Sequence, residues 1–259
     1  MKISGKNILL GMALVVSLIG CKKNNNTAGP AGATGPSGPS LSGTLEGYVD
    51  LFDEYGTLLT PLNGVSVTIA GRSGTDTTIN SGLFAKSLST GTYEVDFAKT
   101  GFGNYKIPSL NFVGGGTQYI ANHVQLTKPA TFSLTSITSA TLSSGNVSVT
   151  VTPSGTDTKT RKVICFYSTN STVSNDPSTY MGSFIATINA NSTTGTGTLL
   201  VTNANAAGLA SGSGYLVYVA AYPIAFVNGA SSYGDIATGK VIYNNINTAS
   251  TVSTSFNFP

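Results

Sequence analysis

Apolar and polar residues alternate over short stretches of the chain from residue 45 onward. The first stretch places four residues on one face of an extended segment: Leu45, Gly47, Val49 and Leu51. The same alternation recurs over residues 65–69, 93–97 and 147–151. A period of two residues is typical of strands that have one buried and one solvated face. The pattern therefore predicts an all-β protein.

The second half of the chain contains a series of short strand-like runs with turn signals between them. They cover residues 132–135, 147–151, 162–168, 183–188, 198–201, 214–222 and 239–243. Such a series of short strands is typical of an immunoglobulin-like sandwich. The tail, residues 244–259, is ambiguous, because Ser253 to Phe258 would form one more edge strand.

The composition of the 259 residues supports a folded, β-rich chain. Charged residues make up only 9% and hydrophobic residues 40%, whereas about 25% of residues are charged in an average globular domain. The low net charge of +3, together with ample Val, Ile, Tyr and Phe, argues against disorder. The balance is not basic enough to indicate nucleic-acid binding.

The first twenty residues have the pattern of a targeting segment. Lys2 and Lys6 precede an apolar run from Ile8 to Ile19, which is short for a bilayer-spanning helix. The run ends in Leu18-Ile19-Gly20-Cys21, which resembles the lipobox of bacterial lipoproteins. The resemblance implies that residues 1–20 are a signal peptide and that Cys21 carries a membrane-anchoring lipid. The alternatives are a secretory signal with an incidental cysteine and a transmembrane anchor, although no stop-transfer pattern follows.

The residues after Cys21 indicate the membrane to which a lipoprotein is sorted. No Asp follows the cysteine directly, which resembles lipoproteins sent to the outer membrane of Gram-negative bacteria. The acid-rich flank of some surface-exported Bacteroidetes lipoproteins is missing. We therefore expect an outer-membrane location, with the surface-exposed and the periplasmic face both open.

Residues 21–42 have the composition of a tether. Glycine recurs at every third position, at Gly29, Gly32, Gly35 and Gly38, which is the collagen repeat. Four triplets are few for a triple helix, so we expect an extended, flexible spacer, with a trimeric stalk as the alternative. Similar runs follow the lipid-bearing cysteine in Bacteroidetes lipoproteins.

Five short motifs follow one another in residues 43–128: Gly47-Tyr-Val49, Pro61-Leu-Asn-Gly64-Val-Ser-Val67, Gly82-Leu-Phe84, Gly91-Thr-Tyr93 and Gly101-Phe102. In this order and spacing they resemble the carboxypeptidase regulatory-like domain, a small transthyretin-like β-sandwich. Phe102 stands where tyrosine is usual, and the region up to Gly114-Gly115-Gly116 is looser than the family norm. The resemblance implies a module whose glycines form turns and whose aromatics fill the core, with no active site of its own.

Residues 129–259 carry a second resemblance. Leu209 lies six residues before Tyr215, which opens an alternating strand. This spacing resembles the tyrosine corner of fibronectin type III domains, in which the tyrosine hydroxyl binds the preceding loop. Val217, Val219 and Ala221 share the parity of Tyr215, so we expect them in the core. The resemblance implies a second β-sandwich, of fibronectin type III or immunoglobulin-like type, although no tryptophan marks its early strands.

Residues that usually carry chemistry are scarce. His123 is the only histidine, and the strand pattern turns it outward, opposite to Val124 and Leu126. Cys165 lies in an apolar run, so we expect a buried thiol that behaves as a small hydrophobic side chain. If Cys21 is acylated, no disulfide can form within the chain. Neither side chain has neighbours in sequence at catalytic or metal-ligand spacing.

The ten acidic residues are scattered over turns and outward strand positions, which does not indicate the paired carboxylates of a glycosidase. Asp50, Asp53 and Glu54 would suit calcium, but their spacing lacks the usual oxygen-rich loop, and a solvated turn is the simpler interpretation. No helix signal follows Gly114-Gly115-Gly116, so a phosphate loop is not expected. Asp76-Thr77-Thr78 resembles the O-glycosylation sequon of Bacteroidetes. We expect no catalytic, cofactor or metal site.

These features predict a non-enzymatic, membrane-anchored envelope lipoprotein that serves as an adhesion or protein-interaction module. The alternative is a glycan-binding accessory lipoprotein of an outer-membrane uptake system, and an enzyme with dispersed residues is a third class. Sugar binding calls for exposed aromatic rings, which four tyrosines in loops or near strand ends would supply: Tyr105, Tyr119, Tyr180 and Tyr233. An exposed aromatic cluster would favour the glycan-binding alternative, and bare Thr/Ser faces would favour the interaction module.

Overall fold

The computed structural model describes residues 40–142, 145–209, 214–225 and 232–258. Strands account for 51% of the described residues and helix for 3%, which confirms the all-β prediction. The signal segment, Cys21 and nearly all of the predicted tether lie outside the described residues. Within the described part of the chain, no helix combines the length and the apolar character needed to cross a bilayer.

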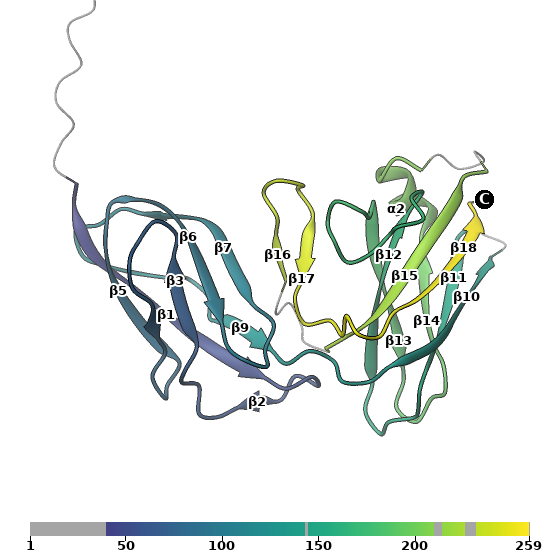
Figure 1. Ribbon diagram of the computed structural model, residues 1–259, viewed down its shortest axis with the longest axis horizontal. Coiled ribbons are helices and arrows are strands. Elements are labelled where there is room, and N and C mark those ends of the chain that lie inside the picture. The colour runs from purple at the N-terminus through teal and green to yellow at the C-terminus, as the bar shows by residue number, and fades with distance from the viewer. Residues whose placement is uncertain (1–39, 143–144, 210–213, 226–231, 259) are drawn as a thin grey trace, which may run out of the picture. The chain divides into compact units, whose positions relative to one another are not determined.

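Two sheets form the first sandwich, which is drawn in purple to teal in Figure 1. One sheet is built around β1 (Ser42–Phe52), which pairs with β2 (Leu58–Leu59), β5 (Leu83–Ser89), β8 (Thr117–Tyr119) and β9 (Val124–Thr127). The other sheet has the order β4 (Asp76–Thr77), β3 (Ser66–Ile69), β6 (Gly91–Ala98) and β7 (Tyr105–Phe112).

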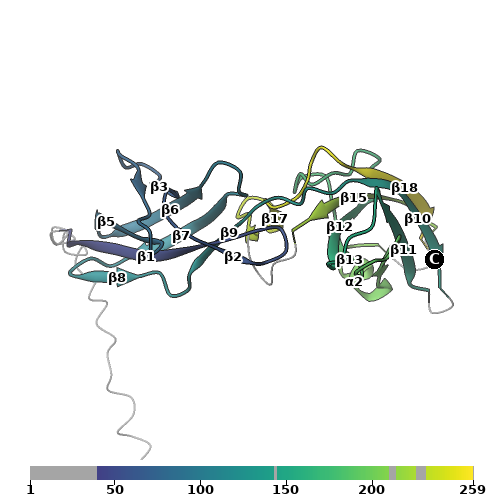
Figure 2. The same ribbon diagram turned by 90° about the horizontal axis from the view of Figure 1, so that it is seen from below.

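Strand β1 has different kinds of partner on its two edges. It runs antiparallel to β5, with Glu46 opposite Ala85. It runs parallel to β8, with Glu46 opposite Tyr119, and parallel to β9, with Asp50 opposite Gln125. Figure 2 shows β8 lying beside β1. The chain between Thr117 and Thr127 therefore follows β1 along most of its length.

The inward residues of these strands form the core that the alternation predicted. Leu45 and Val49 are fully buried and Leu51 is 2% exposed, as expected from their shared parity. Phe84 from β5 meets Phe97 from β6 edge to face, with 5.5 Å between ring centroids. Because full burial of such a side chain contributes roughly 1.5–3 kcal/mol, this core supplies most of the stability of the sandwich.

The second sandwich, drawn in green to yellow in Figure 1, is one continuous sheet. Its order is β10 (Leu134–Thr141), β11 (Val147–Pro153), β14 (Gly195–Leu199), β13 (Gly182–Ile188), β12 (Arg161–Ser168), β15 (Leu216–Ile224) and β18 (Val252–Asn257). The sheet doubles over a single core and brings its edge strands β10 and β18 close together. A separate hairpin consists of β16 (Ser232–Gly234) and β17 (Val241–Tyr243).

Strand β12 is buried on both faces. Val163, Cys165 and Tyr167 face the main core, whereas Ile164 and Phe166 face a second, aromatic cluster on the other side of the sheet. Tyr180 lies over Phe166 in this cluster, with 4.7 Å between ring centroids. The continuous apolar run in the sequence thus marks a strand with two buried sides.

Three predictions for the second sandwich have different outcomes. Val217, Val219 and Ala221 are fully buried, which confirms their predicted parity. Tyr215 is 47% exposed, and residues 210–213 of the loop that its hydroxyl would bind lie outside the described residues, so the tyrosine corner stays a prediction. The ambiguous tail does form a strand, β18, which pairs with β15.

The predicted strand over residues 198–201 is wrong in its second half. β14 ends at Leu199, and helix α2 (Val201–Ala206) begins two residues later. The backbone N–H of Val201 donates to the side-chain oxygen of Asn146 at 2.9 Å, which holds the helix start. The alanines of this segment favour helix, and Ala204 is fully buried against the core.

We expect the substitution Gly82→Ala to destabilise the first sandwich. Gly82 has φ +82°, where an L-residue costs about 1–2 kcal/mol, and an added Cβ would lie 2.4 Å from the carbonyl oxygen of Val49. Gly71→Ala is the matched control, because Gly71 has φ +74° with no atom within 4 Å of the added Cβ. In urea titrations Gly82→Ala should lose more free energy of unfolding than Gly71→Ala. Equal losses would contradict the close approach at Val49.

We expect the thiol of Cys165 to be inert in the folded protein. Its side chain is fully buried, which confirms the sequence prediction, and burial raises the pKa of the thiol to about 12. The thiolate is the reactive species, so its population at neutral pH falls by about 1000-fold for a pKa three units higher. In a Cys21→Ser variant, which leaves one thiol, Ellman's reagent should react slowly until urea unfolds the protein. Fast reaction of the native protein would show that β12 is accessible.

Candidate ligand-binding face

Strand β1 presents three side chains with polar groups on its outer face. Because successive residues of a strand point to opposite sides, the burial of Leu45, Val49 and Leu51 turns Glu46, Tyr48 and Asp50 outward. Tyr48 is 37% exposed although it is an aromatic residue in the middle of the longest strand of the first sandwich.

The parallel partner of β1 adds two rings beside these side chains. The N–H of Ile120 donates to the carbonyl of Glu46 at 2.9 Å, which fixes the chain that connects β8 to β9. Tyr119 lies opposite Glu46 and is 61% exposed. The ring of His123 stacks on the ring of Tyr48, with 5.1 Å between centroids and an angle of 21° between planes. We call Glu46, Tyr48, Asp50, Tyr119 and His123 the tyrosine–histidine face.

Each carboxylate of the tyrosine–histidine face lies beside one of its rings. The Oδ2 atom of Asp50 lies 3.0 Å from Nδ1 of His123, whose side chain is 56% exposed. Glu46 stands opposite Tyr119 in the register of β1 and β8, and its negative charge is the main cause that raises the pKa of Tyr119. Both carboxylates keep oxygen lone pairs free to accept further hydrogen bonds.

The surroundings of this face carry no cationic side chain from the strands. The register places Thr44, Leu83, Ala85, Ser87, Thr117 and Gln125 on the same side of the sheet. None of these positions in the described strands is Lys or Arg. Lys86 stands opposite Leu45 on the inward side and pairs with Asp76, with 3.1 Å between Nζ and Oδ2. The face therefore has two carboxylates and at most one positive charge, on His123.

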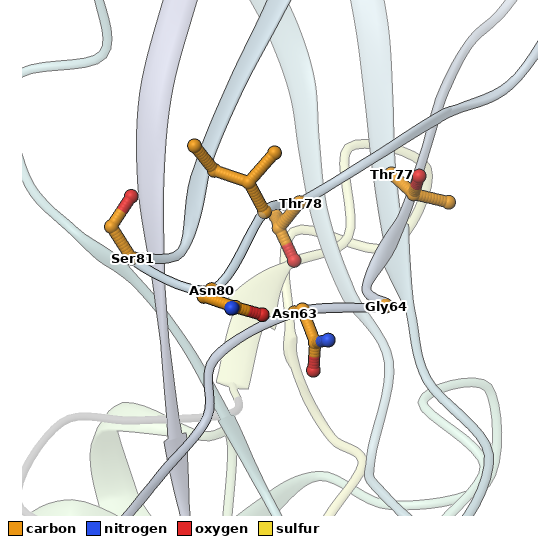
Figure 3. Close-up of a pocket in the computed structure, with 7 residues that line it drawn as sticks. Asn63, Gly64, Thr77, Thr78, Asn80 and Ser81 are labelled. Atoms are coloured by element: carbon orange, nitrogen blue, oxygen red, sulfur yellow. The ribbon is translucent and has the colours of Figure 1, made fainter.

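A second candidate is an open hollow of about 700 Å³ between residues 63–64 and the connection from β4 to β5. Figure 3 shows the amide side chains of Asn63 and Asn80 close together, with Ser81 and Thr77 at the sides. The two segments are held side by side because the N–H of Gly64 donates to the carbonyl of Thr78 at 3.0 Å. Neither a charged nor an aromatic side chain is among its seven lining residues, so it offers only amide and hydroxyl hydrogen bonds.

The two threonines of the predicted glycosylation sequon, Asp76-Thr77-Thr78, line this hollow. The Thr78 hydroxyl is buried, donates to the carbonyl of Leu62 at 2.8 Å and accepts from the N–H of Val65 at 3.1 Å. Thr77 is exposed. Of the two hydroxyls, only that of Thr77 is accessible for modification, and its glycosylation stays a prediction.

The three carboxylates considered for calcium have separate partners. Asp53 accepts from the N–H groups of Tyr55 and Thr57 at 2.9 and 2.8 Å, which is the turn that the sequence predicted. Glu54 accepts from the N–H and the hydroxyl of Thr131, both at 2.7 Å. Asp50 belongs to the tyrosine–histidine face. Among the described residues, no group of three His, Cys, Asp or Glu side chains is placed to hold a metal ion.

The four tyrosines predicted as possible sugar platforms separate into different environments. Tyr119 is well exposed, whereas Tyr180 is only 4% exposed, so the prediction of a possible platform at Tyr180 is wrong. The Tyr180 hydroxyl donates to the carbonyl of Val241 at 2.5 Å, and burial raises its pKa to about 12. Tyr105 packs on the first core, and the half-buried Tyr233 meets it edge to face at 6.2 Å.

We expect the substitution Glu46→Gln to lower the pKa of Tyr119 towards 10, its ordinary value. A nearby negative charge disfavours the tyrosinate, so removing it makes deprotonation easier. The Cζ chemical shift of Tyr119, followed by NMR against pH in ring-labelled protein, measures this. Asp96→Asn, in the other sheet, is the matched control and should leave the titration unchanged. An unaltered titration in Glu46→Gln would contradict the influence of the Glu46 charge on Tyr119.

No protein-family model matches the chain, and no curated protein matches it. Among solved structures, a "putative carbohydrate binding protein" from Bacteroides uniformis matches at 13% identity over 83% of this chain and 98% of that chain, with a TM-score of 0.31. A DUF3823 family protein from Parabacteroides merdae matches at 12% identity over 83% and 100%, with a TM-score of 0.24. A cohesin–X-dockerin complex from Acetivibrio cellulolyticus matches at 21% identity over 33% and 58%, with a TM-score of 0.29. The chain is thus remotely similar to β-rich proteins, two of them from Bacteroidetes.

Proposed function

We propose that the protein is a lipid-anchored binding protein of the bacterial outer membrane that holds a glycan on its tyrosine–histidine face. This is the alternative that an exposed aromatic cluster favours over a bare polar surface. The observation that carries the proposal is the grouping of three exposed rings, Tyr48, Tyr119 and His123, on one side of one sheet.

Sugar rings present two kinds of surface, and the tyrosine–histidine face has groups for both. Their C–H faces pack against aromatic rings, which combine apolar area with little side-chain entropy to lose. Their hydroxyl groups donate hydrogen bonds, and bonds to an ionised acceptor are the stronger kind. Tyr48 and Tyr119 supply the rings, while Glu46 and Asp50 supply the acceptors.

The spacing of the carboxylates supports binding without catalysis. Glu46 and Asp50 are four residues apart on one strand, which corresponds to roughly 13 Å at 3.3–3.4 Å per residue. Glycosidases place their two carboxyl groups about 5–9.5 Å apart. Tyr48 also stands between the two acids. We therefore propose that the protein is not an enzyme and that the ligand leaves unchanged.

The attachment to the membrane rests on the sequence. Cys21 and its lipobox lie outside the described residues, and the described part of the chain begins at residue 40. An extended tether of residues 21–42 would hold the folded part away from the lipid surface.

A protein-interaction role is the second candidate. The outer face of the second sandwich carries facing hydroxyl side chains, since Ser148 stands opposite Thr198 and Thr150 opposite Thr196. Such a bare Ser/Thr surface favours an adhesion or scaffold module. The outward positions of these two strands, β11 and β14, carry no aromatic side chain of the kind that anchors tight protein interfaces.

We expect the full chain to bind neutral β-1,4-linked hexasaccharides, such as those of glucose and N-acetylglucosamine, in isothermal titration calorimetry. Tyr48→Ala and Tyr119→Ala should each weaken the affinity about tenfold, because each removes a stacking ring worth about 1.4 kcal/mol. Tyr119→Phe keeps the ring and should retain most of the affinity. Tyr215→Ala, which removes an exposed tyrosine of the second sandwich, is the control and should bind as the native protein does. Failure of every saccharide to bind would leave the protein-interaction role.

A further inference from the structure

The charge of the tyrosine–histidine face restricts the ligands that it can hold. Both of its acids lie among the rings: Glu46 stands opposite Tyr119 in the register of β1 and β8, and Asp50 lies 3.0 Å from His123. No lysine or arginine shares this side among the described strand positions paired with β1. With a neutral His123 the face carries two negative charges, and with a protonated His123 it carries one.

An anionic sugar would meet repulsion here and no compensating cation. Two like charges at contact distance on a protein surface cost energy, and the closest basic side chain on β5, that of Lys86, is engaged by Asp76 on the inward side. A neutral sugar is accepted by rings and carboxylates together. A sugar with an ammonium group binds more tightly than a neutral sugar, because the ammonium group donates hydrogen bonds to a carboxylate and is attracted by the face of an adjacent aromatic ring.

We infer that the tyrosine–histidine face selects glycans that bear free amino groups, and rejects uronic acid and sulfated glycans. This inference rests on the proposed glycan-binding function. The ammonium group would lie against Glu46 or Asp50 while the sugar ring packs on Tyr119 or Tyr48. Stacking of the sugar on the half-exposed rings supplies most of the binding free energy. The two carboxylates determine that positively charged sugars bind more tightly than negatively charged ones.

The test compares three soluble hexamers of similar size: β-1,4-linked glucosamine, β-1,4-linked N-acetylglucosamine and galacturonic acid. Calorimetry is done with the full chain at a mildly acidic pH, at which the sugar amines are protonated. We expect the glucosamine hexamer to bind at least about tenfold more tightly than the acetylated one, and the galacturonic acid hexamer at least about tenfold more weakly. The preference should shrink as salt is added, since salt screens exposed charges.

The double variant Glu46→Gln, Asp50→Asn removes both negative charges of the face and keeps its three rings, so it separates the effect of charge from that of stacking. It should bind the acetylated hexamer about as the native protein does, and it should lose the preference for the amine. Glu94→Gln, Asp96→Asn is the matched control, because these two acids lie on the other sheet beside Lys106. It should keep the full preference. Thermal melts of both variants establish that they are folded.

The outcomes separate this inference from the proposed function. Equal affinity for the three hexamers, lost on Tyr48→Ala, would overturn the charge selection and leave glycan binding standing. Binding of none of the hexamers would overturn both. A preference for the amine that survives Glu46→Gln, Asp50→Asn would place the selection elsewhere on the protein and overturn the inference. Tight binding of a lysine-rich peptide with no binding of the glucosamine hexamer would make this a protein-docking surface, which would also overturn it.

Discussion

The parallel pairing of β1 with β8 and β9 is the constraint on which the first sandwich depends. Parallel strands cannot be joined by a tight hairpin, and here β2 to β7 form the connection after which the chain returns to the first strand. This return places Val124 and Leu126 in the core beside Val49 and Leu51. The same return sets Tyr119 opposite Glu46 and lays His123 on Tyr48. The pairing of β1 with β8 and β9 therefore positions both the core residues and the tyrosine–histidine face. A change in the register of this pairing would displace both.

The tyrosine–histidine face lies on paired strands, which suits the proposed binding role. Its rings come from β1, from β8 and from the connection after β8 that a backbone hydrogen bond at Ile120 fixes, so little order has to be gained on binding. The hollow at Asn63 and Asn80 has a different character. It has polar groups and no platform, and its Thr78 hydroxyl is already committed to holding two backbone segments together.

The sequence predicted those features that depend on neighbours in the chain. The buried parity of Leu45, Val217 and Cys165 and the outward position of His123 follow from local alternation, and the structure confirms them. The partner of His123 could not be predicted, because Tyr48 is brought to it by a parallel pairing across more than seventy residues of sequence. Local alternation of apolar and polar residues also did not predict which tyrosine side chains are buried by other parts of the chain. Tyr180 is buried because a loop folds back on the outer face of β12, and this is a tertiary event.

The two buried sides of β12 have a consequence for the chain before it is folded. Val163 to Tyr167 is a run of apolar, strand-forming side chains with no charge, which is the kind of segment that associates with other copies when exposed. In the native sheet β13 and β15 cover its edges, and two layers of side chains cover its faces. Arg161 and Lys162 stand directly before it, in the position where charged gatekeeper residues oppose aggregation. Arg161 and Lys162 therefore place two positive charges at the start of this strand, which disfavours its association with other copies while the chain is unfolded.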